Sequence, residues 1–300
     1  RDFPEEPRAE QAFFLRGWAL YQQGHDEDAL QVGRAFLERF PGSPFLEDVR
    51  FWLAEHAFHR GQSQEAREEF LGIAADAVSP VSAAKALYLA GRTALLQGDS
   101  EAAAEFFTRS VRKHPDAPFA AEALFYHGDA LTLLNRFDEA IVVFEQVVAR
   151  FPGTSIALLA RGRIGDCHFT LREQDPSRLA LALSAYRAVE ESSGVPPELR
   201  LQASYKIGTT LAEMGRQEEA LAQYMHVVYR FLEERGRHGV ESEGIFNRAA
   251  TTAAQLFEQR QDWRNAIQVY RLIVDSGVQP AARIAEARIQ SLRLEHFILF

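Results

Sequence analysis

Two histidines on a predicted helix are the first residues whose spacing could do chemistry. His56 and His59 lie three residues apart in the segment AEHAFHR, and Glu55 precedes them. Residues three apart share one face of a helix, so the two imidazoles could hold a metal ion together. The segment lacks the His-Glu-x-x-His motif, and the sequence identifies no third ligand. We therefore interpret the histidines as a surface or groove pair, and we predict no metal and no cofactor.

Cys167 and His168 are the other pair that could act together, as a nucleophile and its base. Adjacent residues of a helix point about 100° apart, which keeps the thiol and the imidazole from meeting. Cys167 also holds a position that small packing residues usually occupy, so we predict a buried, unreactive thiol. The sequence contains no phosphate-binding glycine loop, no serine elbow and no paired-carboxylate site. We therefore predict that the chain is not an enzyme.

These residues belong to a sequence that repeats itself at an interval of thirty-seven positions. Small residues and prolines keep this interval in one register, which predicts a stack of structural units instead of two globular domains. The tracks are Gly17, Ala54, Gly91, Gly128 and Gly165; Gly24, Gly61, Gly98 and Asn135; Ala29, Ala66, Ala103 and Ala140; and Pro41, Pro115 and Pro152.

Each track predicts one feature of a helical hairpin. A glycine inside a helix costs about 1 kcal/mol relative to alanine, so Gly91 and Gly128 indicate that a neighbouring helix crosses too closely for a Cβ atom. Gly98 and Asn135 suit the left-handed residue that ends the first helix. Acidic residues then suit the first turn of a second helix, and a proline stops that helix. Each unit is therefore predicted to hold two helices.

Together these positions resemble the tetratricopeptide repeat, whose pattern includes a Gly, then Ala-x3-Phe, then Pro. The fourth unit matches it at Leu124, Gly128, Ala140, Phe144 and Pro152. The family's usual period is about 34 residues, and here the additional residues fall in the proline turn. The resemblance implies an all-α, right-handed superhelical solenoid of about seven helix-turn-helix repeats with a C-terminal helix.

We expect the repeats to form a single array over residues 1–300. The later units are less regular, because an insertion lengthens the turn of the fifth hairpin and the second helix of the sixth runs long. The expected repeats are approximately 10–43, 47–80, 84–117, 121–154, 158–196, 201–235 and 247–280, and the closing helix is 281–298.

In tetratricopeptide arrays the first helix of each hairpin lines a concave groove, so the resemblance implies a binding surface there. Four aromatic residues at the fifth motif position, Phe14, Phe51, Tyr88 and Phe125, would form a ladder along this groove and anchor a peptide. The alternative is that these rings pack against adjacent repeats. The expected partner-binding residues are Phe14, Trp18, Tyr21, Phe51, Glu55, Phe58, Tyr88, Arg92, Phe125 and Asp129.

We predict a protein–protein interaction scaffold that binds a peptide or a helix in this groove. The alternative that we leave open is a structural, self-associating module, including a homo-oligomer, whose groove stays empty. The net charge of −9 argues against a nucleic-acid partner. No apolar run reaches the roughly 18 residues of a membrane span.

The segment ERFPGSPFLEDVRFWLAEHAF resembles repeat segments of bacterial envelope proteins, namely the Tol–Pal-associated coordinator and the lipoprotein of the outer-membrane barrel assembly machine. This likeness of local sequence favours the periplasm or cell envelope over the cytoplasm. The chain begins with RDFPEEPRAE, without a methionine, and ends with the apolar HFILF. We therefore expect it to be a fragment of a larger bacterial protein.

Overall fold

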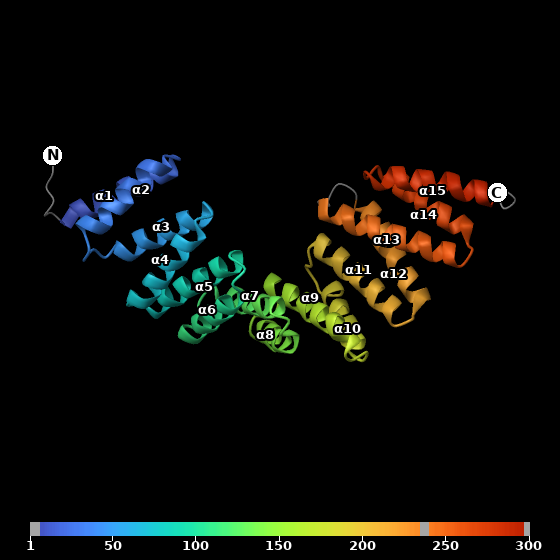
Figure 1. Cartoon of the computed structure of the whole chain (residues 1–300), viewed down its shortest axis with the longest axis horizontal. Helices are drawn as coiled ribbons and strands as arrows, with labels where there is room; N and C mark the ends of the chain where they lie inside the picture. The colour runs from blue at the N-terminus through green and yellow to red at the C-terminus, as the bar shows by residue number, and fades with distance from the viewer. Residues whose placement is uncertain (1–6, 235–239, 297–300) are drawn as a thin grey trace. The chain divides into compact units, whose positions relative to one another are not determined.

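The computed structural model describes residues 7–234 and 240–296, and within these ranges it contains α-helices, one 3₁₀ turn and no strand (Figure 1). This confirms the predicted all-α fold. No helix in these ranges is both long enough and apolar enough to cross a membrane. The expected apolar end, HFILF, lies mostly outside the described residues. The helices are α1 (Pro7–Gln22), α2 (Asp26–Arg39), α3 (Leu46–His59), α4 (Ser63–Asp76), α5 (Pro80–Leu96), α6 (Ser100–Lys113), α7 (Ala120–Leu133), α8 (Phe137–Arg150), α9 (Ser155–Thr170), α10 (Arg178–Glu190), α11 (Pro197–Glu213), α12 (Gln217–Glu233), α13 (Val240–Gln259), α14 (Trp263–Ser276) and α15 (Ala281–Glu295), with the 3₁₀ turn η1 (Leu171–Glu173) after α9.

The helices pair in chain order as seven hairpins and a closing helix, in agreement with the predicted fold class. The chain forms two compact units, Arg1–Val147 and Val148–Phe300, whose boundary falls in the last turn of α8. Within each unit helices that follow one another in sequence pack together, as short loops require. The expected repeat limits stay predictions, because pairing of helices does not fix where one repeat ends and the next begins.

Glycine and proline end the helices where the repeat predicts. Gly24, Gly61 and Gly98 follow the first helix of their hairpins with φ of +76°, and Asn135 adopts the same left-handed conformation with φ of +58°. Glycine is favoured there because it has no Cβ to clash with the backbone. Gln261 does the same in the seventh hairpin, with φ of +59°, which its sequence does not indicate.

The two helices of a hairpin interlock where a small residue on the first helix faces an aromatic ring on the second. A Cβ atom added to Gly128 would lie 2.5 Å from Cε1 of Phe144, and one added to Gly91 would lie 2.7 Å from Cε1 of Phe107. Both rings are fully buried. The predicted close crossing at these glycines is therefore confirmed, and the ring is what fills the space.

The same pairing of positions recurs in both units. The ring follows the small residue by sixteen positions, except in the fifth hairpin, where the insertion extends the separation to twenty-one. The pairs are Ala54 and Phe70, Gly91 and Phe107, Gly128 and Phe144, Gly165 and Tyr186, Gly208 and Tyr224, and Ala254 and Tyr270. All members of these pairs are buried, which identifies the pairing as the repeated core contact.

The substitution Gly165→Ala on α9 is expected to lower the free energy of unfolding by about 1–3 kcal/mol, the usual cost of overpacking. Its Cβ atom would lie 2.5 Å from Cε1 of Tyr186, so the ring must move. Urea unfolding followed by circular dichroism measures the change.

Gly162→Ala on the same helix is the matched control. Apart from its chain neighbours and the backbone of its own helix, no atom lies within 4 Å of the position of its Cβ. The better helix propensity of alanine should therefore raise stability by up to about 1 kcal/mol. Equal effects of the two substitutions would contradict the interlocking contact.

Candidate functional site

The first hairpin departs from the pairing of a small residue with a ring. Gly17 on α1 holds the small-residue position, but the residue sixteen positions later is Gly33, which has no side chain to fill the interior. The side chain nearest to Gly17 is Val32, 3.2 Å from the position of an added Cβ. Because valine is smaller than phenylalanine, the space that a ring fills in the other hairpins is only partly occupied here.

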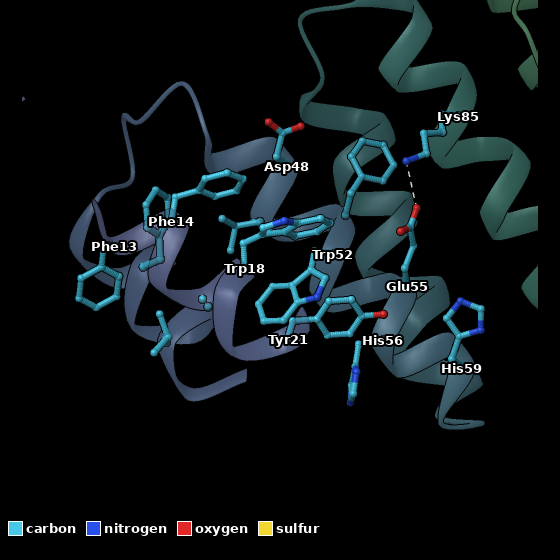
Figure 2. Close-up of a pocket in the computed structure, with 16 residues that line it drawn as sticks. Phe13, Phe14, Trp18, Tyr21, Asp48, Trp52, Glu55, His56, His59 and Lys85 are labelled. Carbon is cyan, nitrogen blue, oxygen red and sulfur yellow. Dashed lines mark ion pairs between the residues drawn. The ribbon is translucent and has the colours of Figure 1, made fainter. Parts of the chain in front are cut away.

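A pocket of about 390 Å³ opens at this place in the first unit (Figure 2). Its walls come from α1, α2 and α3, with one residue from α5. The lining residues are Phe13, Phe14, Gly17, Trp18, Tyr21, Val32, Gly33, Phe36, Asp48, Val49, Phe51, Trp52, Glu55, His56, His59 and Lys85. The pocket therefore brings together five of the ten residues expected to bind a partner.

Trp52 of α3 occupies part of the space above Gly33. A Cβ atom at Gly33 would lie 2.5 Å from Cζ3 of the indole, so glycine is required for this packing. The indole also meets the ring of Tyr21 edge-on, with centroids 5.7 Å apart. Trp52 is a pocket residue that the repeat analysis missed. The signal for it was Gly33 itself, which interrupts the track of Phe70, Phe107 and Phe144.

Three aromatic residues form the α1 wall of the pocket. Phe14, Trp18 and Tyr21 are spaced so that they share one face of α1 (Figure 2). Phe14 stacks on Phe45 with centroids 5.0 Å apart, and Trp18 lies 6.0 Å from Tyr21. Trp18 remains 48% exposed. A large apolar ring is therefore left half uncovered in a concave site.

An ion pair crosses from α3 to α5 at the edge of the pocket. Nζ of Lys85 lies 3.0 Å from Oε1 of Glu55 and 4.4 Å from the centroid of the Phe51 ring. A cation above an aromatic face is attracted by the negative charge of the ring. Asp48, one turn before Phe51 on α3, is exposed at the same pocket.

The two histidines of α3 both line the pocket, but they differ in burial. His59 is exposed, whereas His56 is 8% exposed and its Nε2 has no hydrogen-bond partner. Nε1 of Trp52 is also buried without a partner. Leaving a buried polar atom unpaired costs about 1–3 kcal/mol. Within the described ranges no group of three or more His, Cys, Asp or Glu residues could hold a metal ion.

Three of the expected residues, Phe58, Tyr88 and Arg92, do not line the pocket and form a separate stack. The guanidinium of Arg92 lies over the rings of Phe58, Tyr88 and Tyr126, at 5.5, 6.0 and 5.6 Å. Tyr88 also stacks on Phe119, which precedes the next hairpin, with centroids 5.5 Å apart. These side chains pack against one another across adjacent hairpins. This is the arrangement that we left open as the alternative to a ladder of peptide-binding rings.

Two rings of the expected ladder, Phe51 and Phe125, are each only 7% exposed. Phe51 still lines the pocket, whereas Phe125 does not. Phe125 packs 5.6 Å from Phe144 of its own hairpin. The motif position places each ring on the correct face of its helix, but the next helices cover it. Asp129, one turn further along α7, is half-buried and lies outside the pocket.

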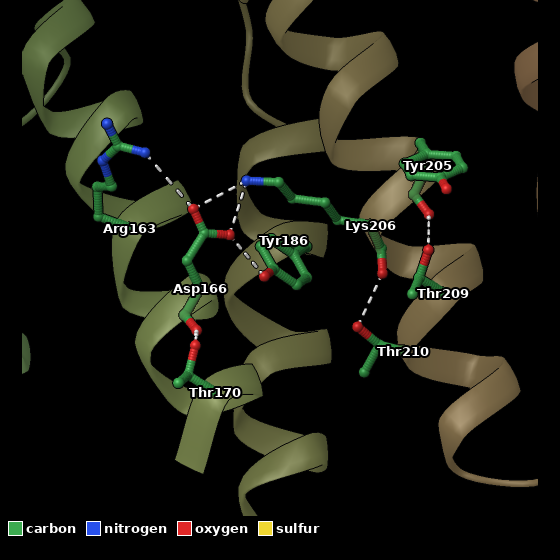
Figure 3. A network of polar contacts seen from close by, with 8 residues as sticks. All are labelled: Arg163, Asp166, Thr170, Tyr186, Tyr205, Lys206, Thr209 and Thr210. Atoms are coloured by element: carbon green, nitrogen blue, oxygen red, sulfur yellow. Dashed lines mark hydrogen bonds and ion pairs between the residues drawn. The ribbon is translucent and has the colours of Figure 1, made fainter. Parts of the chain in front are cut away.

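In the second unit a polar network joins three consecutive helices (Figure 3). Nζ of Lys206 on α11 lies 2.6 and 2.9 Å from the carboxylate oxygens of Asp166 on α9, and the hydroxyl of Tyr186 on α10 donates to the same carboxylate at 2.7 Å. Burial raises the pKa of the Tyr186 hydroxyl, and the Asp166 carboxylate raises it further. The ammonium of Lys206 neutralises the Asp166 carboxylate, and the Tyr186 hydroxyl donates to it. We therefore interpret this network as structural.

Comparisons with known proteins agree with the helical hairpins. Two family models, each described as a tetratricopeptide repeat, match the chain, one over residues 1–44, 72–118 and 88–153 and the other over residues 201–231. A bovine (Bos taurus) SGT1 homolog is 32% identical over 91 residues, which cover 30% of this chain and 26% of that protein. The chain therefore matches about a quarter of the length of this relative.

Solved structures share the fold at low sequence identity. The C-terminal part of a TPR repeat-containing protein from Cytophaga hutchinsonii aligns with a TM-score of 0.68 and 13% identity, covering 91% of this chain and 98% of that one. A tetratricopeptide repeat protein from Parabacteroides merdae gives 0.57 and 11%, covering 95% and 99%. YrrB, described as a TPR protein with an unusual peptide-binding site, gives 0.50 and 20%, covering 66% and 91%.

Tyr186→Phe is expected to make the stability of the second unit less sensitive to alkaline pH. The raised pKa of Tyr186 means that the folded chain keeps a proton that the unfolded chain releases above about pH 10. The wild-type free energy of unfolding should therefore fall as pH rises through this range, and the variant should lack this contribution.

Urea unfolding between about pH 8 and about pH 11 measures both chains. At the lower pH the variant should be less stable by about 1.5–3 kcal/mol, since it loses a hydrogen bond to a charged group. Parallel pH dependences of the two chains would contradict the assignment.

Proposed function

The chain is a tetratricopeptide repeat protein, and from this premise we propose that it is a non-enzymatic scaffold that binds a peptide or helical segment of a partner in the pocket of its first unit. The fold is that of protein–protein interaction scaffolds. The observation that carries the proposal is the half-exposed indole of Trp18 inside a pocket walled by other rings.

The composition of the pocket supports a protein ligand. Tryptophan and tyrosine are enriched among the residues that dominate binding energy, above all where they lie in a recess that excludes water. The pocket volume of about 390 Å³ is within the range of sites that enclose a ligand group. The peptide-binding site named for YrrB makes a peptide the first class of ligand to test here.

The proposed contact residues are those that the pocket gathers on α1 and α3. Phe14, Trp18 and Tyr21 supply rings from α1, and Phe51 and Glu55 complete the wall from α3. Phe58, Tyr88 and Arg92, whose side chains stack together, are proposed to support the site without being its centre. Phe125 and Asp129 lie outside the pocket and are proposed to have the same supporting role. Self-association, a cell-envelope location and membership of a larger bacterial protein rest on sequence alone and stay proposals.

Trp18→Ala tests the proposal with peptides selected from a random dodecamer library displayed on phage. Peptides that bind the wild-type chain should bind the variant at least about thirtyfold more weakly, the loss of about 2 kcal/mol expected for an anchoring residue. Isothermal titration with the synthetic peptides measures both affinities.

Leu15→Ala is the matched control, because Leu15 is 51% exposed on the same helix and does not line the pocket. It should leave peptide affinity and melting temperature unchanged. If the selected peptides bind Trp18→Ala and the wild-type chain equally well, the pocket is not the binding site.

A further inference from the structure

The lining of the pocket combines aromatic faces with a carboxylate. Trp18 exposes about half of its surface there, between Phe14 and Tyr21 on the same face of α1. Asp48 of α3 lines the same pocket with an exposed carboxylate. The face of an indole is the aromatic surface that attracts cations most strongly, and a nearby carboxylate adds to this attraction.

The charges around the pocket leave one carboxylate in excess. Lys85 is paired with Glu55 at 3.0 Å, so these two charges neutralise each other. Asp48 forms no ion pair with any residue of the described ranges. With the histidines set aside, the two carboxylates and one ammonium give the lining a charge of −1.

Lys85 demonstrates that this lining can hold a cation. Its ammonium group is bound by the Glu55 carboxylate and by the face of the Phe51 ring, 4.4 Å away. Trp18 and Asp48 supply the same two components, an aromatic face and a carboxylate, from the α1 and α3 walls of the same pocket. Within the described ranges no lysine or arginine of the chain lies over the Trp18 ring.

A basic ligand group fits this pocket better than an apolar one. An apolar side chain that fills the pocket would remove water from Asp48 without replacing its interactions, which is costly for a charged group. An ammonium or guanidinium group pairs with the carboxylate, and its hydrocarbon stem covers the ring. The net charge of −9 on the chain also favours encounter with a basic partner.

Resting on the function proposed above, we propose that the pocket accepts a lysine or arginine side chain of the partner, held between the ring of Trp18 and the carboxylate of Asp48. Phe14 and Tyr21 flank this position and contact the stem of the side chain. The partner is thus a basic peptide segment.

The peptides selected from the dodecamer library test this proposal directly. They should contain a lysine or an arginine whose replacement by norleucine or citrulline, respectively, weakens binding to the wild-type chain at least tenfold. Asp48→Asn should weaken binding of the original peptides at least threefold and should leave the affinity for the neutral versions unchanged.

Asp28→Asn is the control, because it removes the same charge from the chain as Asp48→Asn. Asp28 is exposed on α2 and lies outside the pocket. It should leave affinity unchanged, and an equal loss in the two variants would overturn the proposal in favour of long-range attraction. Peptides that need Trp18 but contain no essential basic residue would overturn it while leaving the proposed function intact. A library that yields no peptide dependent on Trp18 would overturn both.

Discussion

An aromatic ring on the second helix of a hairpin, seated on a small residue of the first, is the contact on which this structure depends. Burial of a phenylalanine contributes about 1.5–3 kcal/mol, and the ring also fixes how closely the two helices approach. Since each repeat contacts only its neighbours, the contact must be built again in every hairpin. The glycines at Gly91, Gly128, Gly165 and Gly208 follow from it, because a Cβ atom there would meet the ring at less than 3 Å.

The candidate site arises where this contact is missing. With Gly33 at the position of the ring, the first hairpin has no side chain at this point, and Trp52 from the next hairpin packs over the glycine. The remaining space is the pocket. A ring at position 33 would cover the aromatic side chains that now line it. The fold and the proposed binding surface thus depend on the same contact. Its presence holds the other hairpins together, and its absence in the first hairpin leaves the pocket.

Much of the architecture could be predicted from the sequence because it is set by local chemistry repeated in one register. Gly98 and Asn135 end helices by their own backbone preference, which needs no knowledge of the tertiary structure. The coverage of Phe51 and Phe125 could not be predicted in this way, because a motif position gives the face of a helix but not which side chains of the neighbouring helices pack on it. The same holds for Lys206, which finds Asp166 forty positions away on another hairpin.

The most direct measurement is a crystal structure of the double variant Gly33→Phe with Trp52→Ala, together with its melting temperature. These changes restore the ring to the first hairpin and remove the indole that now occupies its place. The account expects the new ring to pack against Gly17, the pocket to disappear and the melting temperature to be retained. A pocket of unchanged volume, with the new ring turned to solvent, would contradict the claim that the missing ring creates the site.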